Sequence, residues 1–315
     1  SAEKIQYIYY DGDKEVARFD SASAGKVWLE ECEMMGMDIE FGFDGDFSTL
    51  RREVEYVDLG VEKGYEVFDQ IMDDYKKSAN TPVFKGYVSA STGAEVFRHK
   101  VATLKKYKGS RAGRKPVHLE AVRNYALSKQ DIQQVPAYLE CDDYVQAYAQ
   151  KKGEIGQLLS LDKDALTAVG CWVLNENYFD EAIFSDPNTL GFIEKSGDNV
   201  RGIGYLFFMG QQIFGDTADS VTGVPKAGKA KALEVLSPFN NQPVSKLPDA
   251  LLEVAKLYKK AYGDKYTYKH WETGETITRG WYEMMLEQSQ LLYMLKSSKD
   301  SVEKSVLRYL NKESV

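Results

Sequence analysis

The succession of helix-like and strand-like segments constrains the fold of this chain more than any other feature. In the middle of the chain these segments are a helix near 60–77, a strand at 81–89, helices at 116–129 and 137–149, and a strand within 154–164. Alternation of this kind predicts an α/β fold with a mostly parallel central sheet flanked by helices. Helical periodicity then continues without strands, which predicts an all-helical C-terminal third. Its helices are expected around 201–214, 226–236, 247–262 and 281–296.

The N-terminal residues form a separate pattern. Residues 7–19, YIYYDGDKEVARF, alternate apolar and polar side chains around Asp11-Gly12, which is typical of a tight β-hairpin. A helix is expected at 22–37, and the polar stretch 41–58 connects it to the next helix. We therefore divide the chain into an N-terminal hairpin and helix insertion at 1–57, an α/β core at 58–195, a helix–turn–helix at 196–245 and a C-terminal helical region at 246–315.

Charge and cysteine content limit the classes of function. The net charge of −8 and the pI near 5.2 do not suggest a generally basic nucleic-acid-binding protein, so the distribution of lysine and arginine matters more than their total. The three cysteines, Cys32, Cys141 and Cys171, lack C-x-x-C spacing, which fits a reducing compartment without structural zinc. The apolar run at 203–210 is too short for a membrane span, and we find no secretory signal, so we expect a cytoplasmic protein without a membrane partner.

Acidic residues gather at three places in the chain. Glu140, Asp142 and Asp143 crowd the start of the 137–149 helix, where capping and the helix dipole would by themselves favour carboxylates. Asp162 and Asp164 follow the apolar run LLSL. Because residues two apart in an extended chain point the same way, both carboxylates can face a site at the carboxyl end of a strand.

The alternative for this second pair is a surface loop in which Lys163 balances the charge. The third pair is Asp216 and Asp219. If all three groups converge, their carboxylates cannot all stay ionised unless cations neutralise them. Divalent ions with oxygen ligands, above all Mg²⁺ with Mn²⁺ as an alternative, suit this role, and two ions about 3.5–4 Å apart support phosphodiester hydrolysis. The predicted metal ligands are Glu140, Asp142, Asp143, Asp162, Asp164, Asp216 and Asp219.

The motifs ECDD, SLDKD and GDTADSVTGVPKAGKAKA, in this order, resemble those of the structure-specific 5′-nucleases, the superfamily of flap endonucleases and 5′-exonucleases. Members carry a Glu-Ala-Asp-Asp cluster, an Asp-Lys-Asp strand end and a Gly-Asp-x-x-Asp-Asn-x-x-Gly-Val segment. Here Cys141 replaces the alanine, and Ser220 stands where asparagine is common. The resemblance covers residues 80–240 best, and the flanks look most like bacteriophage 5′-exonucleases.

This resemblance implies a PIN-like 5′-nuclease fold with a helix–turn–helix DNA clamp at 196–245. It also implies a magnesium-dependent enzyme that hydrolyses DNA at 5′ ends, nicks or flaps by a two-metal mechanism. Its implied setting is DNA replication, in the host cytoplasm for a phage-encoded protein, with replication proteins as further partners.

The resemblance also gives roles to basic residues. Residues 98–118 contain eight lysines and arginines and no acid, a run that is either a solvated surface or a phosphate-binding segment. In the family this position holds an arch over the active site, through which a 5′ single strand passes. Lys108 and Arg111 match its Tyr-Lys-x-x-Arg pattern and would bind the scissile phosphate and stabilise the transition state. The other basic residues expected to bind DNA here are Arg98, Lys105, Lys106, Arg114 and Lys115.

Residues 223–230, GVPKAGKA, match the pattern G-x-x-x-x-G-K of a nucleotide-binding P-loop. However, Ala230 replaces the hydroxyl residue that coordinates magnesium, and a polar turn rather than a buried strand precedes the segment. We therefore favour a turn of the DNA clamp that holds duplex phosphates without reading bases. Family clamps often bind K⁺ here; lysine in place of a common glycine makes this K⁺ site an open alternative. The predicted DNA-binding residues of the turn are Gly223, Lys226, Gly228, Lys229 and Lys231.

Two hypotheses for the function remain from the sequence. One is an active 5′-nuclease, and the other is a catalytically incomplete relative that binds branched DNA without cutting it. They differ in the family's first strand, which ends in Asp-Gly. Of the two candidates, Asp11 fits a hairpin turn and Asp44 lies in a polar stretch, so we expect the first strand and its aspartate to precede Ser1.

Overall fold

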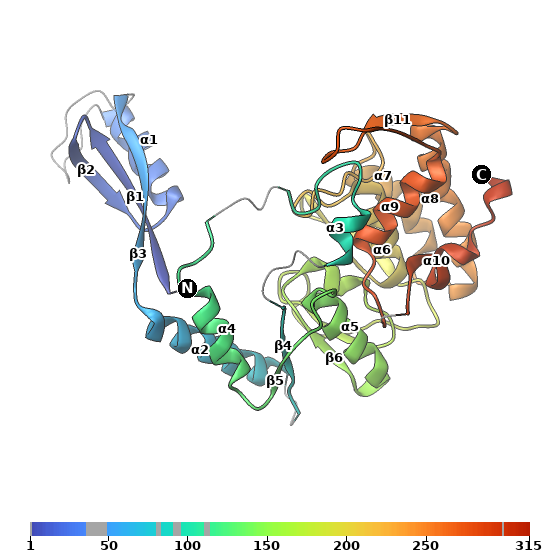
Figure 1. The fold of residues 1–315 in the computed structure, drawn as a ribbon, viewed down its shortest axis with the longest axis horizontal. Helices are drawn as coiled ribbons and strands as arrows, with labels where there is room; N and C mark the ends of the chain where they lie inside the picture. The colour runs from blue at the N-terminus through green and yellow to red at the C-terminus, as the bar shows by residue number, and fades with distance from the viewer. Residues whose placement is uncertain (1, 36–48, 80–82, 91–95, 110–113, 298) are drawn as a thin grey trace. The chain divides into compact units, whose positions relative to one another are not determined.

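The computed structural model describes residues 2–35, 49–79, 83–90, 96–109, 114–297 and 299–315. The chain forms two compact units (Figure 1). The N-terminal unit comprises residues 1–74 and 114–129, and the C-terminal unit comprises residues 75–113 and 130–315. The four functional parts expected from the sequence remain a prediction.

The N-terminal unit contains a three-stranded antiparallel sheet in the order β2-β1-β3. β1 (Glu3–Asp11) and β2 (Lys14–Phe19) form the predicted hairpin, and Gly12 takes a positive φ of 57° in its turn. β3 (Arg51–Asp58) lies in the stretch expected to be a polar connection, and it pairs with β1 along its whole length. All but one of its residues are exposed, so β3 carries no buried apolar face that the sequence could reveal.

Helices complete this unit. α1 (Ala22–Met35) contributes Trp28 to a small core with Tyr9, Val16 and Ala17 of the hairpin. α2 (Val61–Ala79) runs across the boundary of the unit, and α4 (Leu119–Leu127) packs against it. Their contact includes Tyr65 and Tyr125, whose rings stack with centroids 4.2 Å apart.

The strands of the C-terminal unit form small, separate sheets. β4 (Gly86–Val88) pairs in parallel with β5 (Ile132–Gln134). β6 (Gln157–Leu159) pairs in parallel with β7 (Trp172–Leu174), whose other neighbour, β8 (Ile183–Phe184), is antiparallel. The mixed α/β class is as expected, but the large, mostly parallel central sheet is not found among the described residues. Each of these strands has only two or three residues, too few to build such a sheet.

Two antiparallel hairpins were not expected. The first joins β9 (Phe192–Ser196) to β10 (Asn199–Ile203). The second joins β11 (Tyr266–Lys269) to β12 (Thr276–Arg279) within the C-terminal third. The prediction of an all-helical C-terminal third is therefore wrong at these eight residues, where YTYK and TITR have a period of two rather than 3.6.

The remaining helices lie in the C-terminal unit, and most of them contribute to its main core. In chain order they are α3 (Phe97–Val101), α5 (Cys141–Lys152), α6 (Gly204–Phe214), α7 (Lys229–Leu236), α8 (Leu247–Tyr262), α9 (Trp281–Leu292) and α10 (Val302–Ser305). α6 is buried on nearly every side because its residues are almost all apolar. It packs against α7, α8 and α9 and so forms the centre of this core. Among the described helices, none combines the length and hydropathy needed to cross a membrane.

Candidate metal centre

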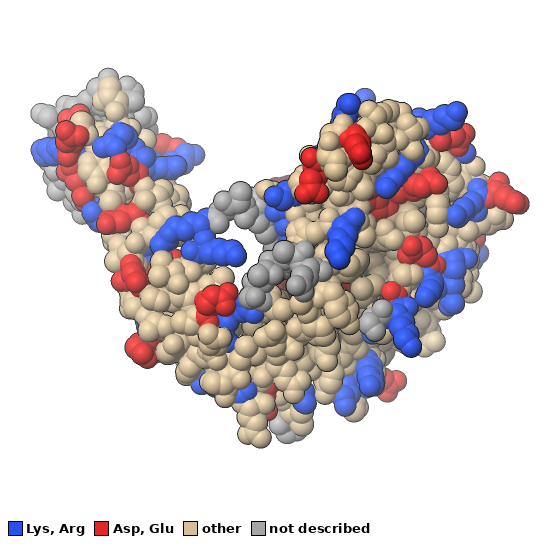
Figure 2. Space-filling model, viewed as in Figure 1, with Lys and Arg blue, Asp and Glu red and all other residues tan. Residues whose placement is uncertain are grey.

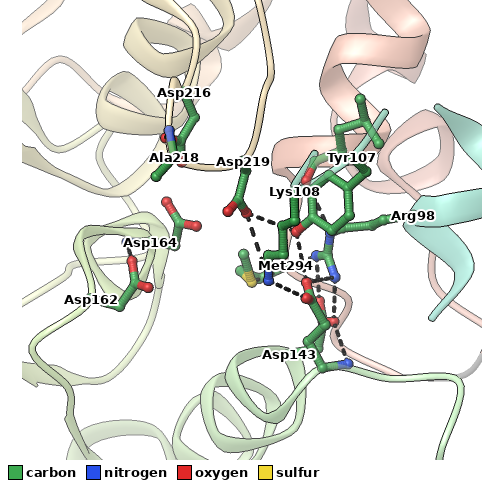
Figure 3. A network of polar contacts seen from close by, with 12 residues as sticks. Arg98, Tyr107, Lys108, Asp143, Asp162, Asp164, Asp216, Ala218, Asp219 and Met294 are labelled. Carbon is green, nitrogen blue, oxygen red and sulfur yellow. Dashed lines mark hydrogen bonds and ion pairs between the residues drawn. The ribbon is translucent and has the colours of Figure 1, made fainter. Parts of the chain in front are cut away.

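Three buried aspartates lie together in the C-terminal unit. Asp164, Asp216 and Asp219 each offer a carboxylate oxygen, and these oxygens lie within 4.8 Å of one another. Asp164 belongs to the 3₁₀ helix η3 (Lys163–Thr167), which follows β6, whereas Asp216 and Asp219 lie in the turn after α6 (Figure 3). The structure therefore brings together acids from the second and third predicted groups.

Local hydrogen bonds fix these side chains. Asp162 caps η3, because its Oδ1 accepts a 3.0 Å bond from the Asp164 amide. In the turn after α6, Asp216 and Val221 exchange backbone bonds of 2.8 and 2.7 Å. The turn begins at Gly215, whose φ of 74° and crowded Cβ position favour glycine.

The charges of the aspartates are only partly compensated by the protein. The Lys163 ammonium lies 2.7 Å from Asp216 Oδ2, and Gln211 Nε2 donates a 2.6 Å bond to Asp164 Oδ1. Burial, reinforced by the charge of Asp162, nevertheless raises the pKa of Asp164 to about 7. A bound cation would lower this pKa, because its positive charge would favour the ionised carboxylate.

Asp142, an acid of the first predicted group, is exposed to solvent. The protein atoms around its carboxylate and the charges of Asp162 and Glu140 nevertheless raise its pKa to about 6. Asp142 thus interacts with the charge of Asp162, which in turn acts on the buried Asp164.

Asp143 lies in a different environment. It is fully buried, and Arg98, which is also fully buried, forms a two-pronged ion pair with it. Nη1 of Arg98 lies 2.6 Å from Asp143 Oδ2, and Nη2 lies 2.8 Å from Oδ1. The Leu295 amide donates a further 2.8 Å bond to Asp143 Oδ1. Arg98 also donates to the backbone carbonyls of Leu291 and Tyr293.

Glu140 connects this ion pair to the aspartate group. Its carboxylate accepts bonds from Arg98 Nη1 and the Tyr107 hydroxyl, both at 2.9 Å, and it forms an ion pair with Lys108. Burial disfavours its ionisation, but the two cations outweigh this and hold the pKa of Glu140 below its usual value. Tyr107 and Lys108 also reach Asp219, at 2.8 and 3.8 Å (Figure 3).

A cavity of about 490 Å³ opens onto the aspartates. Asp162, Asp164, Asp216 and Asp219 line one side of it. Its other lining residues, which carry no charge, are Leu161, Asn177, Tyr178, Ser196, Asn199, Val200 and Ala218, and Lys163 is the basic residue that lines it. The cavity gives solutes access to the buried carboxylates.

The basic run at 98–118 is distributed over different environments. Arg98 is buried, and Lys108 is half-buried beside Glu140. Lys105 and Lys106 are exposed. Arg111 lies outside the described residues. Two further residues of the run, Arg114 and Lys115, are exposed and belong to the N-terminal unit. There Arg114 forms an ion pair with Glu3 at 2.6 Å.

The predicted clamp turn joins α6 to α7. Gly223, with a φ of 64°, lies against the backbone of Gly215, and Gly228 is the residue that precedes α7. Lys226 and Lys229 are exposed. The remaining lysine of the turn, Lys231, pairs with Glu234 at 2.5 Å. On the face shown in Figure 2, basic and acidic side chains are interspersed over the C-terminal unit.

Several residues of this centre had no signal in the sequence. Arg98 looked like one more residue of a basic run, and Gln211 lies in an apolar helix without any motif. Their partners, Asp143 and Asp164, are 45 and 47 positions away in the chain. The two candidates for a first catalytic aspartate are not part of the described centre: Asp11 is exposed at the end of β1 in the N-terminal unit, and Asp44 lies outside the described residues.

Comparison with known proteins gives a structural similarity at low sequence identity. No protein-family model and no curated protein matches the sequence. A structure of T5 5′-exonuclease with bound zinc ions is 17% identical, with a TM-score of 0.43, over 72% of this chain and 80% of its own. A T5 protein co-crystallised with metal ions is 16% identical, with a TM-score of 0.42 and the same coverage. The chain is thus similar in structure, at low identity, to T5 5′-exonuclease.

Proposed function

We propose that this protein is a metal-dependent 5′-nuclease that hydrolyses DNA phosphodiesters at 5′ ends, nicks or flaps. The observation that carries the proposal is the buried group of Asp164, Asp216 and Asp219, which opens onto a cavity. A bound cation would stabilise the ionised form of buried carboxylates this close together, and an all-oxygen ligand set favours Mg²⁺ or Mn²⁺ over softer metals. The order of the acidic motifs in the sequence supports the assignment to 5′-nucleases.

These aspartates would hold one divalent ion, and the exposed acids Asp142 and Asp162 are available to a second. When bound, such ions supply Lewis-acid stabilisation of a phosphoryl group and activation of water. Lys108, whose ammonium lies near both Glu140 and Asp219, would bind a phosphate oxygen at this centre. Its backbone amide donates a 3.0 Å bond to the Asp219 carbonyl, which ties its loop to the aspartate group.

The proposal is tested by incubating 5′-labelled nicked and flapped duplexes with the protein in Mg²⁺ and in EDTA. We expect short labelled products in Mg²⁺ and none in EDTA. Asp219→Asn should abolish cleavage, whereas Asp249→Asn, an exposed α8 residue paired with Lys246, should leave it unchanged. Cleavage that persists in EDTA or in the Asp219 variant would contradict the metal centre.

A second candidate function is a related protein that binds branched DNA without cutting it. It is favoured by one observation, that Arg98 and Lys108 already neutralise acids of the first group. Fluorescence anisotropy with a labelled flap separates the two: binding without cleavage supports this candidate. Lys229→Ala should weaken that binding and make the slope of log K against log[salt] shallower by about 0.9, the value for one phosphate contact. The control Lys260→Ala, at an exposed position of α8, should change neither the affinity nor this slope.

A further inference from the structure

The four acceptor positions of the Asp143 carboxylate are all occupied by protein donors. Oδ1 accepts from Arg98 Nη2 and from the Leu295 amide, each at 2.8 Å. Oδ2 accepts from Arg98 Nη1 at 2.6 Å and from the Glu140 amide at 3.3 Å. An ionised carboxylate offers about four lone-pair sites, so Asp143 has none left for a metal ion.

Glu140 is engaged in the same way. Its side chain accepts from Arg98 and Tyr107 and forms an ion pair with Lys108. By contrast, the Asp164 carboxylate accepts a side-chain hydrogen bond from Gln211 alone among the described residues. Glu140 and Asp143 therefore form a saturated pair, whereas Asp164 keeps acceptor positions that these donors do not fill.

Arg98 holds the saturated pair against a distant part of the chain. Its Nε donates a 2.9 Å bond to the Leu291 carbonyl, and Nη2 donates a 2.7 Å bond to that of Tyr293. These carbonyls lie at the C-terminal end of α9, where backbone acceptors lack helical partners and the helix dipole favours a cation. Arg98 thus joins the end of α9 to the start of α5.

We propose that Arg98 and Asp143 are positioning residues, not metal ligands, and that they hold Glu140 so that its carboxylate orients Lys108 toward Asp219. The inference rests on the proposed metal centre and changes its ligand set. Metal binding then belongs to Asp164, Asp216 and Asp219 with the exposed acids, and the ammonium of Lys108 is placed by a relay of hydrogen bonds that begins at α9.

Mn²⁺ binding followed by electron paramagnetic resonance tests the ligand assignment without any need for catalysis. Asp219→Asn removes a ligand and should weaken Mn²⁺ binding at least about tenfold. Arg98→Met/Asp143→Asn should bind Mn²⁺ within about threefold of wild type, because its asparagine can still accept the Leu295 bond and no charge is left buried without a partner. An equal loss in the two variants would overturn the proposal, and this result does not depend on whether the protein cleaves DNA.

Single-turnover cleavage tests the positioning role. The Arg98→Met/Asp143→Asn variant should lower the cleavage rate at saturating DNA while leaving the KM for DNA unchanged. In a Lys108→Ala background the same pair of changes should cause no further loss, because the residue that they orient is already gone. Fully additive losses would refute the relay. Circular dichroism establishes that each variant is folded before its result is counted.

Discussion

Removal of the Arg98 guanidinium should destabilise the protein more than removal of the whole ion pair. Arg98→Met leaves the fully buried carboxylate of Asp143 with two backbone amides as its remaining donors. Breaking a buried pair from one side costs about 3–5 kcal/mol. In the double variant Arg98→Met/Asp143→Asn the buried charge is absent, so the cost should fall to about 1–2 kcal/mol, the value of the lost hydrogen bonds. We therefore expect the double variant to be about 2–3 kcal/mol more stable than Arg98→Met alone.

Urea unfolding followed by tryptophan fluorescence measures these differences. Three of the four tryptophans lie in the C-terminal unit, so a Trp28→Phe background restricts the signal to that unit. Arg201→Met, which breaks an exposed 2.7 Å ion pair with Glu194, is the matched control and should cost less than about 1 kcal/mol. If Arg98→Met costs no more than this control, or if the double variant is as unstable as Arg98→Met alone, the ion pair does not have the role that its burial indicates.

Two further predictions concern the turn after α6 and the charge of the aspartate group. Gly223→Ala should lower the melting temperature, because φ is 64° at this residue and the added Cβ would lie 2.5 Å from backbone atoms. Gly228→Ala should have little effect, because φ is −101° and the space around its Cβ position is open. Equal effects of the two changes would contradict the strain argument. In EDTA, the pKa of Asp164 is near 7 in the folded state, against 3.8 for the ordinary group, so between these values the folded state retains a proton that the unfolded state loses. The stabilising contribution of this proton is present below about pH 4 and is lost as the pH rises through 7. The melting temperature of Asp164→Asn relative to wild type should therefore rise between about pH 5 and pH 8, and a flat difference would refute the shift.

The sequence predicts those elements whose own pattern is strong. α8, expected at 247–262, spans Leu247–Tyr262, because its apolar stripe, its proline in the first turn and the following Gly263 all mark the same helix. β3 has no buried face and is held by backbone bonds to β1, so side-chain periodicity could not reveal it. The central sheet was inferred from alternation alone, which does not determine whether short strands join one sheet or several.

The centre was predicted in part, for a similar reason. Acids two or three positions apart, such as Asp216 and Asp219, can be recognised in the sequence from their local spacing. The structure does bring this pair beside Asp164. The use of Asp143 depends on Arg98, which no local pattern links to it. The simpler interpretation of an acid at a helix N-terminus, that it binds the unpaired backbone amides there, describes Asp143 well, since its Oδ2 accepts a 3.3 Å bond from the Glu140 amide.

The bond between Arg98 and the Leu291 carbonyl joins residues 193 positions apart, which has a consequence for the order in which the protein is made. Ribosomes release a chain from its N-terminus, so the acidic motifs emerge well before α9. Until residue 295 has left the exit tunnel, Arg98 lacks the Leu291 and Tyr293 carbonyls and Asp143 lacks the Leu295 amide. The Arg98–Asp143 pair therefore gains its backbone partners only after α9 has emerged, later than the residues that form the aspartate group.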